Sequence, residues 1–128
     1  LSKNDIAAKL VASYIFEPDV ARFNNDLLSH ALTNNDYDVQ EYKVLPNNPY
    51  SGKTYGEVFL DIKQQYGCIT IGMVKIHDGQ RFLLKVPADS TIVEAGDYLI
   101  FILNGEQSPT IAEVFHVPEG VVPDSDKK

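Results

Sequence analysis

Four residues that could bind phosphate, Ser51-Gly52-Lys53-Thr54, lie between a predicted strand and a predicted helix. A phosphate-binding P-loop also needs a glycine five positions before Gly52, so that its backbone can wrap the phosphates. Asn47 occupies that position, and no G-x-G-x-x-G sequence occurs, so we predict no P-loop and no NAD site in this chain. Thr54 and Glu57 have the spacing of a capping box, which favours the start of a helix instead.

Catalytic and metal-binding patterns are missing from the sequence. His30, His77 and His116 fall on three separate predicted elements, with no second His or Cys at ligand spacing. Cys68 is the only cysteine, which excludes a disulfide framework and a thiolate metal site within one chain. No G-x-S-x-G sequence positions a nucleophile. We therefore expect that the protein is not an enzyme, and a nucleotide-hydrolysing enzyme is the last of our hypotheses.

Three cations flank a predicted hairpin that we expect a partner to bury: Lys75, Arg81 and Lys85. They could pair with acids across an interface, or hold an anionic ligand such as a nucleotide. With Met73 and His77 they form the predicted ligand-binding set. Carboxylates are plentiful, but no loop has the EF-hand pattern, so a metal site is not assigned. A divalent cation and a nucleotide both remain open as effectors.

The charge balance limits the class of partner. Eighteen acidic and eleven basic residues give the 128-residue chain a net charge of −7, and the basic residues are scattered. This balance opposes a polyanionic partner, so we expect no nucleic acid. No apolar run reaches the roughly 18 to 20 residues of a membrane span, and no signal peptide is visible. The chain starts at Leu1, and we expect it to be a fragment of a longer protein.

Residues 1–30 are predicted to form two helices that are separated at Glu17-Pro18, because a residue before proline avoids the helical conformation. Apolar positions recur at helical spacing along both helices. These two stripes need a partner surface, which we expect in another subunit. The predicted interface residues are Ile6, Leu10, Val11, Tyr14, Val20, Phe23 and Leu27.

The rest of the chain predicts a β-α-β-β-β-α domain over residues 39–116, after a linker at 33–38 and before a polar tail at 117–128. The predicted helix over 54–66 ends at Gly67, and Asp78-Gly79 marks a hairpin turn. Gly72, inside a strand, indicates a bulge or a close backbone approach. Tyr98–Leu103 is apolar throughout, so both of its faces should be covered. Ser108 is expected to cap a last short helix.

The amino-acid sequence of this predicted domain resembles the C-terminal domain of the RCK/TrkA family. The resemblance rests on G-K-T-Y-G-E-V, on Y-G-C-I-T-I-G-M-V-K, and above all on D-S-T-I-V-E-A-G-D-Y-L. The earlier run A-A-K-L-V-A-S-Y-I-F-E-P-D-V-A-R-F resembles the crossover helix pair that closes the family's N-terminal half. The expected fold class is therefore α+β, with a helix-turn-helix crossover (residues 1–32) followed by a domain with a mainly antiparallel sheet.

The resemblance implies a cytoplasmic, ligand-sensing and dimerising regulatory domain that controls a potassium channel or transporter. A homodimer, a membrane pore subunit and a small-molecule or ion effector are the implied partners, at the inner face of the cell membrane. The alternative is the sensor domain of a transcription regulator with an N-terminal helix-turn-helix. The segment 13–30 carries only Arg22 against three acids, which is unfavourable for binding DNA phosphates.

Overall fold

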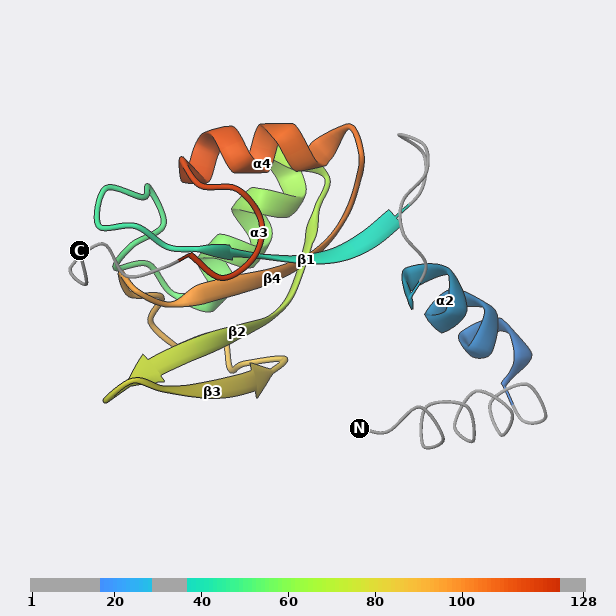
Figure 1. The fold of residues 1–128 in the computed structure, drawn as a ribbon, viewed down its shortest axis with the longest axis horizontal. Helices are drawn as coiled ribbons and strands as arrows, with labels where there is room; N and C mark the ends of the chain where they lie inside the picture. The colour runs from blue at the N-terminus through green and yellow to red at the C-terminus, as the bar shows by residue number, and fades with distance from the viewer. Residues whose placement is uncertain (1–16, 29–36, 123–128) are drawn as a thin grey trace.

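The computed structural model describes residues 17–28 and 37–122. These residues form α2 (Pro18–Leu28), β1 (Tyr37–Lys43), α3 (Tyr55–Tyr66), β2 (Ile69–His77), β3 (Gln80–Lys85), β4 (Tyr98–Asn104) and α4 (Gln107–Phe115) (Figure 1). The α+β class and the predicted β-α-β-β-β-α order of the domain are confirmed, whereas the N-terminal helix-turn-helix crossover is not. The first predicted helix, with Ile6, Leu10, Val11 and Tyr14, and the side chain of Leu27 lie outside the described residues.

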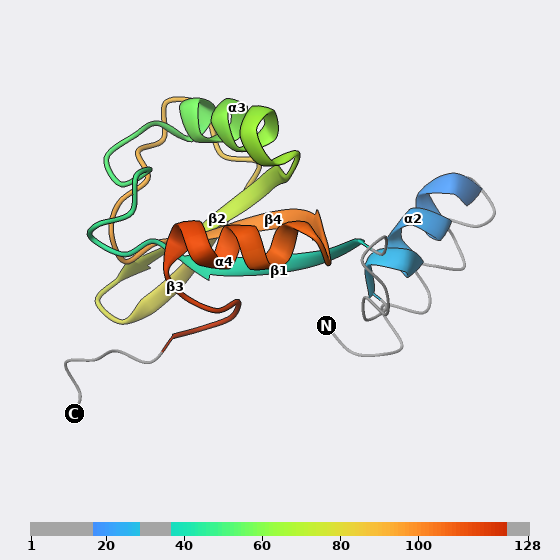
Figure 2. The same ribbon diagram turned by 90° about the horizontal axis from the view of Figure 1, so that it is seen from above.

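The four strands form one antiparallel sheet in the order β1-β4-β2-β3. The last strand in sequence, β4, therefore lies inside the sheet, between β1 and β2. Helices α3 and α4 both cover one face of the sheet, where Figure 2 shows them side by side. Strands β1 and β3 form the two outer edges.

The hydrophobic core lies between this face of the sheet and the two helices. Alternate residues of β4 point into it, as the period of two in a strand requires. Tyr42 packs there against the rings of Phe101 and Phe115 at centroid distances of 6.0 Å. Its hydroxyl donates to Gln40 Oε1 at 2.7 Å and lies 3.0 Å from Ser108 Oγ. The fully buried aliphatic residues of this core include Val58, Ile62, Leu99, Leu103 and Ile111.

Both ends of α3 follow the sequence prediction. Thr54 Oγ1 accepts from the Glu57 amide, and the Glu57 carboxylate accepts from the Thr54 amide, which completes the capping box. Gly67 ends the helix in the left-handed conformation, at φ 71°.

The predicted start of α4 is wrong. Ser108 does not cap this helix, because the helix already begins at Gln107. Asn104 Oδ1 instead accepts from the amides of Glu106 and Gln107, at 3.1 and 2.9 Å. The Ser108 hydroxyl lies inside the helix and donates to Gln40 Oε1. An asparagine at the end of β4 thus replaces the serine that the sequence pattern favoured.

Gly72 marks a bulge in β2, as predicted. The register of β2 against β4 shifts between Thr70 and Gly72. A Cβ atom at Gly72 would lie 2.9 Å from the backbone oxygen of Leu84 on the neighbouring strand. The close approach of β3 therefore requires glycine at this position.

Residues 117–122, which were expected to belong to a polar tail, pack along β1. The Gly120 amide donates to the Glu41 carbonyl oxygen at 2.8 Å, and the Val122 amide donates to Tyr98 Oη at 3.0 Å. Val117 is buried, and Val122 packs against the core. This segment therefore covers part of the outer edge of β1.

Candidate functional site

The sheet face opposite α3 and α4 forms the candidate site, and we call it the open face. The prediction that β4 is covered on both faces holds fully on the helix side and in part on the open face, where Tyr98 is buried and Ile100 and Ile102 are half-buried. Val39, Ile69 and Ile76 on neighbouring strands are each more than a third exposed. A groove of about 410 Å³ crosses this face, lined by Val39, Gln40, Glu41, Val74, Arg81, Leu83 and Ile100.

Arg81 is the cation of this groove. Its guanidinium carbon lies 4.6 Å from the centre of the Tyr98 ring, and its Nη2 lies 3.3 Å from Glu41 Oε2. A long, partly exposed ion pair of this kind contributes little stability. Arginine carries five N–H donors, and one of them serves Glu41. The guanidinium is therefore available to bind an anionic group beside an apolar surface.

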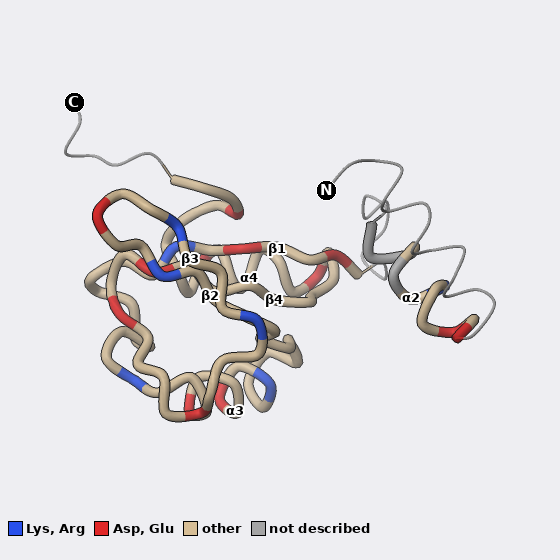
Figure 3. Tube along the Cα trace, turned by 90° about the horizontal axis from the view of Figure 1, so that it is seen from below, with Lys and Arg blue, Asp and Glu red and all other residues tan. Residues whose placement is uncertain are grey.

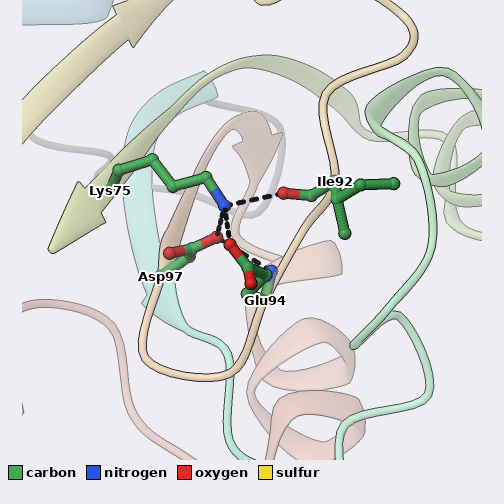
Figure 4. Close-up of polar contacts among 4 residues, drawn as sticks. All are labelled: Lys75, Ile92, Glu94 and Asp97. Carbon is green, nitrogen blue, oxygen red and sulfur yellow. Dashed lines mark hydrogen bonds and ion pairs between the residues drawn. The ribbon is translucent and has the colours of Figure 1, made fainter. Parts of the chain in front are cut away.

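Lys75 lies on the helix side of the sheet and is bound within its own chain (Figure 4). Its ammonium donates to Ile92 O at 2.7 Å, to Glu94 Oε1 at 2.8 Å and to Asp97 Oδ2 at 2.7 Å. These three bonds use all three of its N–H donors. Asp97 Oδ2 also accepts from the Glu94 amide at 2.8 Å. Lys75 therefore fastens the loop before β4 to the middle of β2.

The surroundings of Lys75 change the acidity of two groups. Burial alone would lower the pKa of Lys75, but the hydrogen bonds and charges of Asp97 and Glu94 outweigh it, so the pKa is raised. The hydrogen bond from Lys75 lowers the pKa of the Glu94 carboxyl. Both shifts favour the charged forms of Lys75 and Glu94.

The five predicted ligand-binding residues do not form one cluster. Met73 is fully buried in the core and Lys75 is bound as described, both on the helix side. His77 lies at the hairpin turn with its side chain 80% exposed. Only Arg81 and Lys85 lie on the open face, because the side chains of β3 alternate between the two faces.

Sequence reasoning missed most of the groove, including Glu41, Val74 and Ile100. The unbroken apolar run of β4 was the available signal, because it pointed to a second covered face. The partners of Arg81 could not be read from spacing, since Glu41 lies 40 residues earlier in the chain.

Two other kinds of site find no support in the described part of the chain. Among residues 17–28 and 37–122, no three His, Cys, Asp or Glu side chains come together as a metal-binding group. No described helix has the length and apolar character that a membrane crossing requires.

Residues 39–116 match the family model of the TrkA-C domain. The chain belongs to the TrkA-C domain family. A comparison of this TrkA-C domain with curated proteins found no match.

Solved structures share the fold. The RCK domain of GsuK superposes with a TM-score of 0.56 at 20% identity, over 91% of this chain and 22% of that one. The human SLO3 gating ring superposes with a TM-score of 0.60 at 19% identity, over 74% of this chain and 18% of that one. The RCK_C domain dimer of S. agalactiae BusR in complex with c-di-AMP superposes less well, with a TM-score of 0.45 at 22% identity. The match covers 59% of this chain and 92% of that one. This TrkA-C domain thus spans about a fifth of the chains of the GsuK and SLO3 structures.

Proposed function

We propose that this TrkA-C domain is the ligand-sensing, dimerising regulatory part of a potassium channel or transporter. It acts in the cytoplasm, at the inner face of the cell membrane, and transmits ligand binding to a pore subunit or domain. Its family supports a regulatory role, and proteins of the same fold include the GsuK channel and the SLO3 gating ring. It is a binding domain and not an enzyme.

The open face is the observation that carries this proposal. Its groove combines the apolar walls of Val74, Leu83 and Ile100 with the cation of Arg81. An effector with an apolar body and an anionic group matches this lining. Arg81 would exchange its weak bond to Glu41 for the stronger charge-assisted bond to the ligand.

Regulation also requires two states with different affinities for the ligand, because equal affinity shifts no equilibrium. A dimer supplies such states through the relative placement of its subunits. Val20 and Phe23 of α2 support an intersubunit surface, because they are 45% and 56% exposed. We propose that they form the dimer interface with the other residues of the predicted stripes: Ile6, Leu10, Val11, Tyr14 and Leu27.

Thermal unfolding of the 128-residue chain against a ligand panel tests the sensing function. The panel contains Ca²⁺, Mg²⁺, Na⁺, ATP, ADP, AMP, NADH and cyclic di-AMP. A ligand at 100 times its Kd stabilises the folded state by about 2.7 kcal/mol, which raises Tm by several degrees at this size. We expect a selective shift from one anionic ligand.

Two variants test whether the ligand binds in the groove. Arg81→Leu keeps an apolar side chain over Tyr98 but removes the cation, and it should abolish the shift. His77→Ala is the matched control, because this exposed hairpin residue lies outside the groove. A shift that survives in Arg81→Leu would contradict the site, and no shift from any ligand would contradict sensing by this domain. Tight, salt-dependent binding to duplex DNA would favour the transcription-regulator alternative instead.

A further inference from the structure

The two outer edges of the sheet differ. The edge at β1 is partly covered, because Gly120 donates to the Glu41 carbonyl oxygen. At the edge of β3, no hydrogen bond joins the outward backbone groups to any other described residue. An uncovered edge presents unpaired N–H and C=O groups in a row, which a second strand can pair with.

The hydrogen-bonding direction of β3 identifies these groups. Val86, directly after the strand, donates inward to the Ile71 carbonyl oxygen of β2. Because backbone groups alternate along an antiparallel strand, the even-numbered residues of β3 bond to β2. The amides and carbonyls of Arg81, Leu83 and Lys85 therefore point outward.

Apolar side chains are exposed on both faces of this same edge strand. Phe82, on the helix side, is 45% exposed, and Leu83, on the open face, is 55% exposed. Natural edge strands usually avoid this combination, because it promotes pairing with another chain. The strand therefore fits an apolar partner strand.

We infer that β3 pairs antiparallel with β3 of a second copy of this chain, so that two four-stranded sheets join into one continuous sheet. This inference rests on the dimer proposed above, and it adds a contact between the sheets of the two subunits. A pairing around a two-fold axis places each residue opposite one on the same face, and two registers, centred on Phe82 and on Leu83, each pair five of the six residues of the strand.

Charge selects between these two registers. Centring the pair on Leu83 would place Arg81 opposite Lys85. Like charges directly opposite each other are destabilising. Centring on Phe82 places Arg81 opposite Leu83 and brings Lys85 beside the turn Asp78-Gly79 of the other copy.

The register centred on Phe82 is therefore complementary to itself. The carboxylate of Asp78 is 88% exposed, and Lys85 is exposed with no described ion-pair partner. The two-fold axis creates this Lys85–Asp78 pair twice. Arg81 and Leu83 exchange backbone hydrogen bonds across the axis, and the two Phe82 side chains meet on it. Figure 3 shows how basic residues (blue) and acidic residues (red) are distributed along the strands, seen from below.

Cysteine cross-linking tests the register directly. Phe82→Cys should form an intersubunit disulfide under mild oxidation, because residues opposite each other lie within the Cα separation that a disulfide spans. In Arg81→Cys, each cysteine lies opposite Leu83 of the other copy, two positions away from the other cysteine, so the two should not cross-link. The native thiol gives no background, because Cys68 is buried and burial raises its pKa to about 11. Cross-linking of Leu83→Cys but not of Phe82→Cys would overturn this register.

A proline variant tests the strand pairing without disturbing the fold. Leu83→Pro removes an outward N–H and leaves the pairing of β3 with β2 intact, as proline on an edge strand allows. We expect it to weaken dimerisation at least tenfold in sedimentation equilibrium while circular dichroism stays native. Asp78→Asn and Lys85→Gln should each weaken the dimer about two- to tenfold, and the double variant no further.

The outcomes separate this inference from the proposed dimer. A wild-type chain that is monomeric would overturn both. A wild-type dimer that neither cross-links through Phe82→Cys nor weakens in Leu83→Pro would overturn the β3 contact alone. If Leu83→Pro loses its native circular dichroism, the cross-linking of Phe82→Cys decides the matter by itself.

Discussion

Contacts between residues far apart in the sequence stabilise this domain, and the hydrogen bonds of the Lys75 ammonium are the clearest example. The ammonium joins β2 to Ile92, Glu94 and Asp97 in the loop before β4. Backbone hydrogen bonds also hold this loop, since the Val93 amide donates to the Lys53 carbonyl oxygen and the Thr91 carbonyl oxygen accepts from the Tyr55 amide. The bonds of the ammonium leave Lys75 no free N–H donor for a ligand, so we propose Arg81 and not Lys75 as the cation that binds it.

Asp97→Asn should lower the free energy of unfolding by about 1–3 kcal/mol, because it leaves the Lys75 charge without its buried partner. Urea unfolding measures this loss. Glu94→Gln is the matched control, since the Glu94 side chain is 68% exposed and solvent screens its pair, so the loss should be much smaller. Equal losses in the two variants would contradict the role of Asp97.

The stability of this cluster should depend on pH on both sides of neutrality. The pKa of Lys75 is raised in the folded state, so its contribution is present below the unfolded value of 10.5 and disappears as pH rises through the folded value. The pKa of Glu94 is lowered, so its contribution is present above 4.5 and disappears as pH falls through the folded value.

The difference in Tm between the wild-type chain and Lys75→Met should therefore be largest between these two limits. It should shrink in alkali above the first limit and in acid below the second. A difference that stays constant through both regions would mean that the charges contribute nothing.

Val86 is held in a conformation that β-branched residues avoid. Its φ is 45°, and its side chain is 79% exposed, so no packing compensates for the strain. Val86→Gly should raise the free energy of unfolding by about 0.5–1 kcal/mol, as strain relief exceeds the entropy cost of glycine. Val86→Ala is the control, because alanine keeps most of the strain. A stabilisation as large with alanine would show that φ is not the cause.

Among the elements, β2 is sensitive to substitution at Gly72, where its bulge against β4 lies next to the backbone of β3. Gly72→Ala would place a methyl group 2.9 Å from the Leu84 backbone oxygen, so the two strands would have to separate locally. We expect a loss of about 1–3 kcal/mol in urea unfolding. A loss below about 0.5 kcal/mol would show that β3 moves away at little cost.

Sequence alone predicted the elements whose signals are local. The capping box at Thr54, the stop at Gly67 and the turn at Asp78-Gly79 all depend on hydrogen bonds between residues close in the chain. The start of α4 was missed because Asn104 and Ser108 are both good capping residues, and tertiary contacts with Gln40 and Tyr42 engage the serine.

The candidate site was harder to predict because it depends on contacts between residues far apart in the chain. Its residues come from all four strands, and strand order alone decides which of them meet. Alternation within β3 correctly predicts that Arg81 and Lys85 share a face, but it cannot show that Tyr98 and Glu41 contact Arg81. The packing of residues 117–122 on β1 likewise had no local signal.

At the scale of the whole molecule, the described helices α3 and α4 both cover the same face of the sheet. Half-exposed apolar side chains remain on the other face, and the β3 edge has no described partner. Burial of such surface is the main driving force of association. The net charge of −7 opposes self-association at low salt, but the cations on β3 place favourable charge at the proposed contact.

Sedimentation equilibrium of the unmodified chain at tens of micromolar, at physiological ionic strength, tests the central claim most directly. A dimerising regulatory domain predicts twice the chain mass of 14.3 kDa, with dissociation on dilution. A single species of 14.3 kDa at every concentration would contradict it.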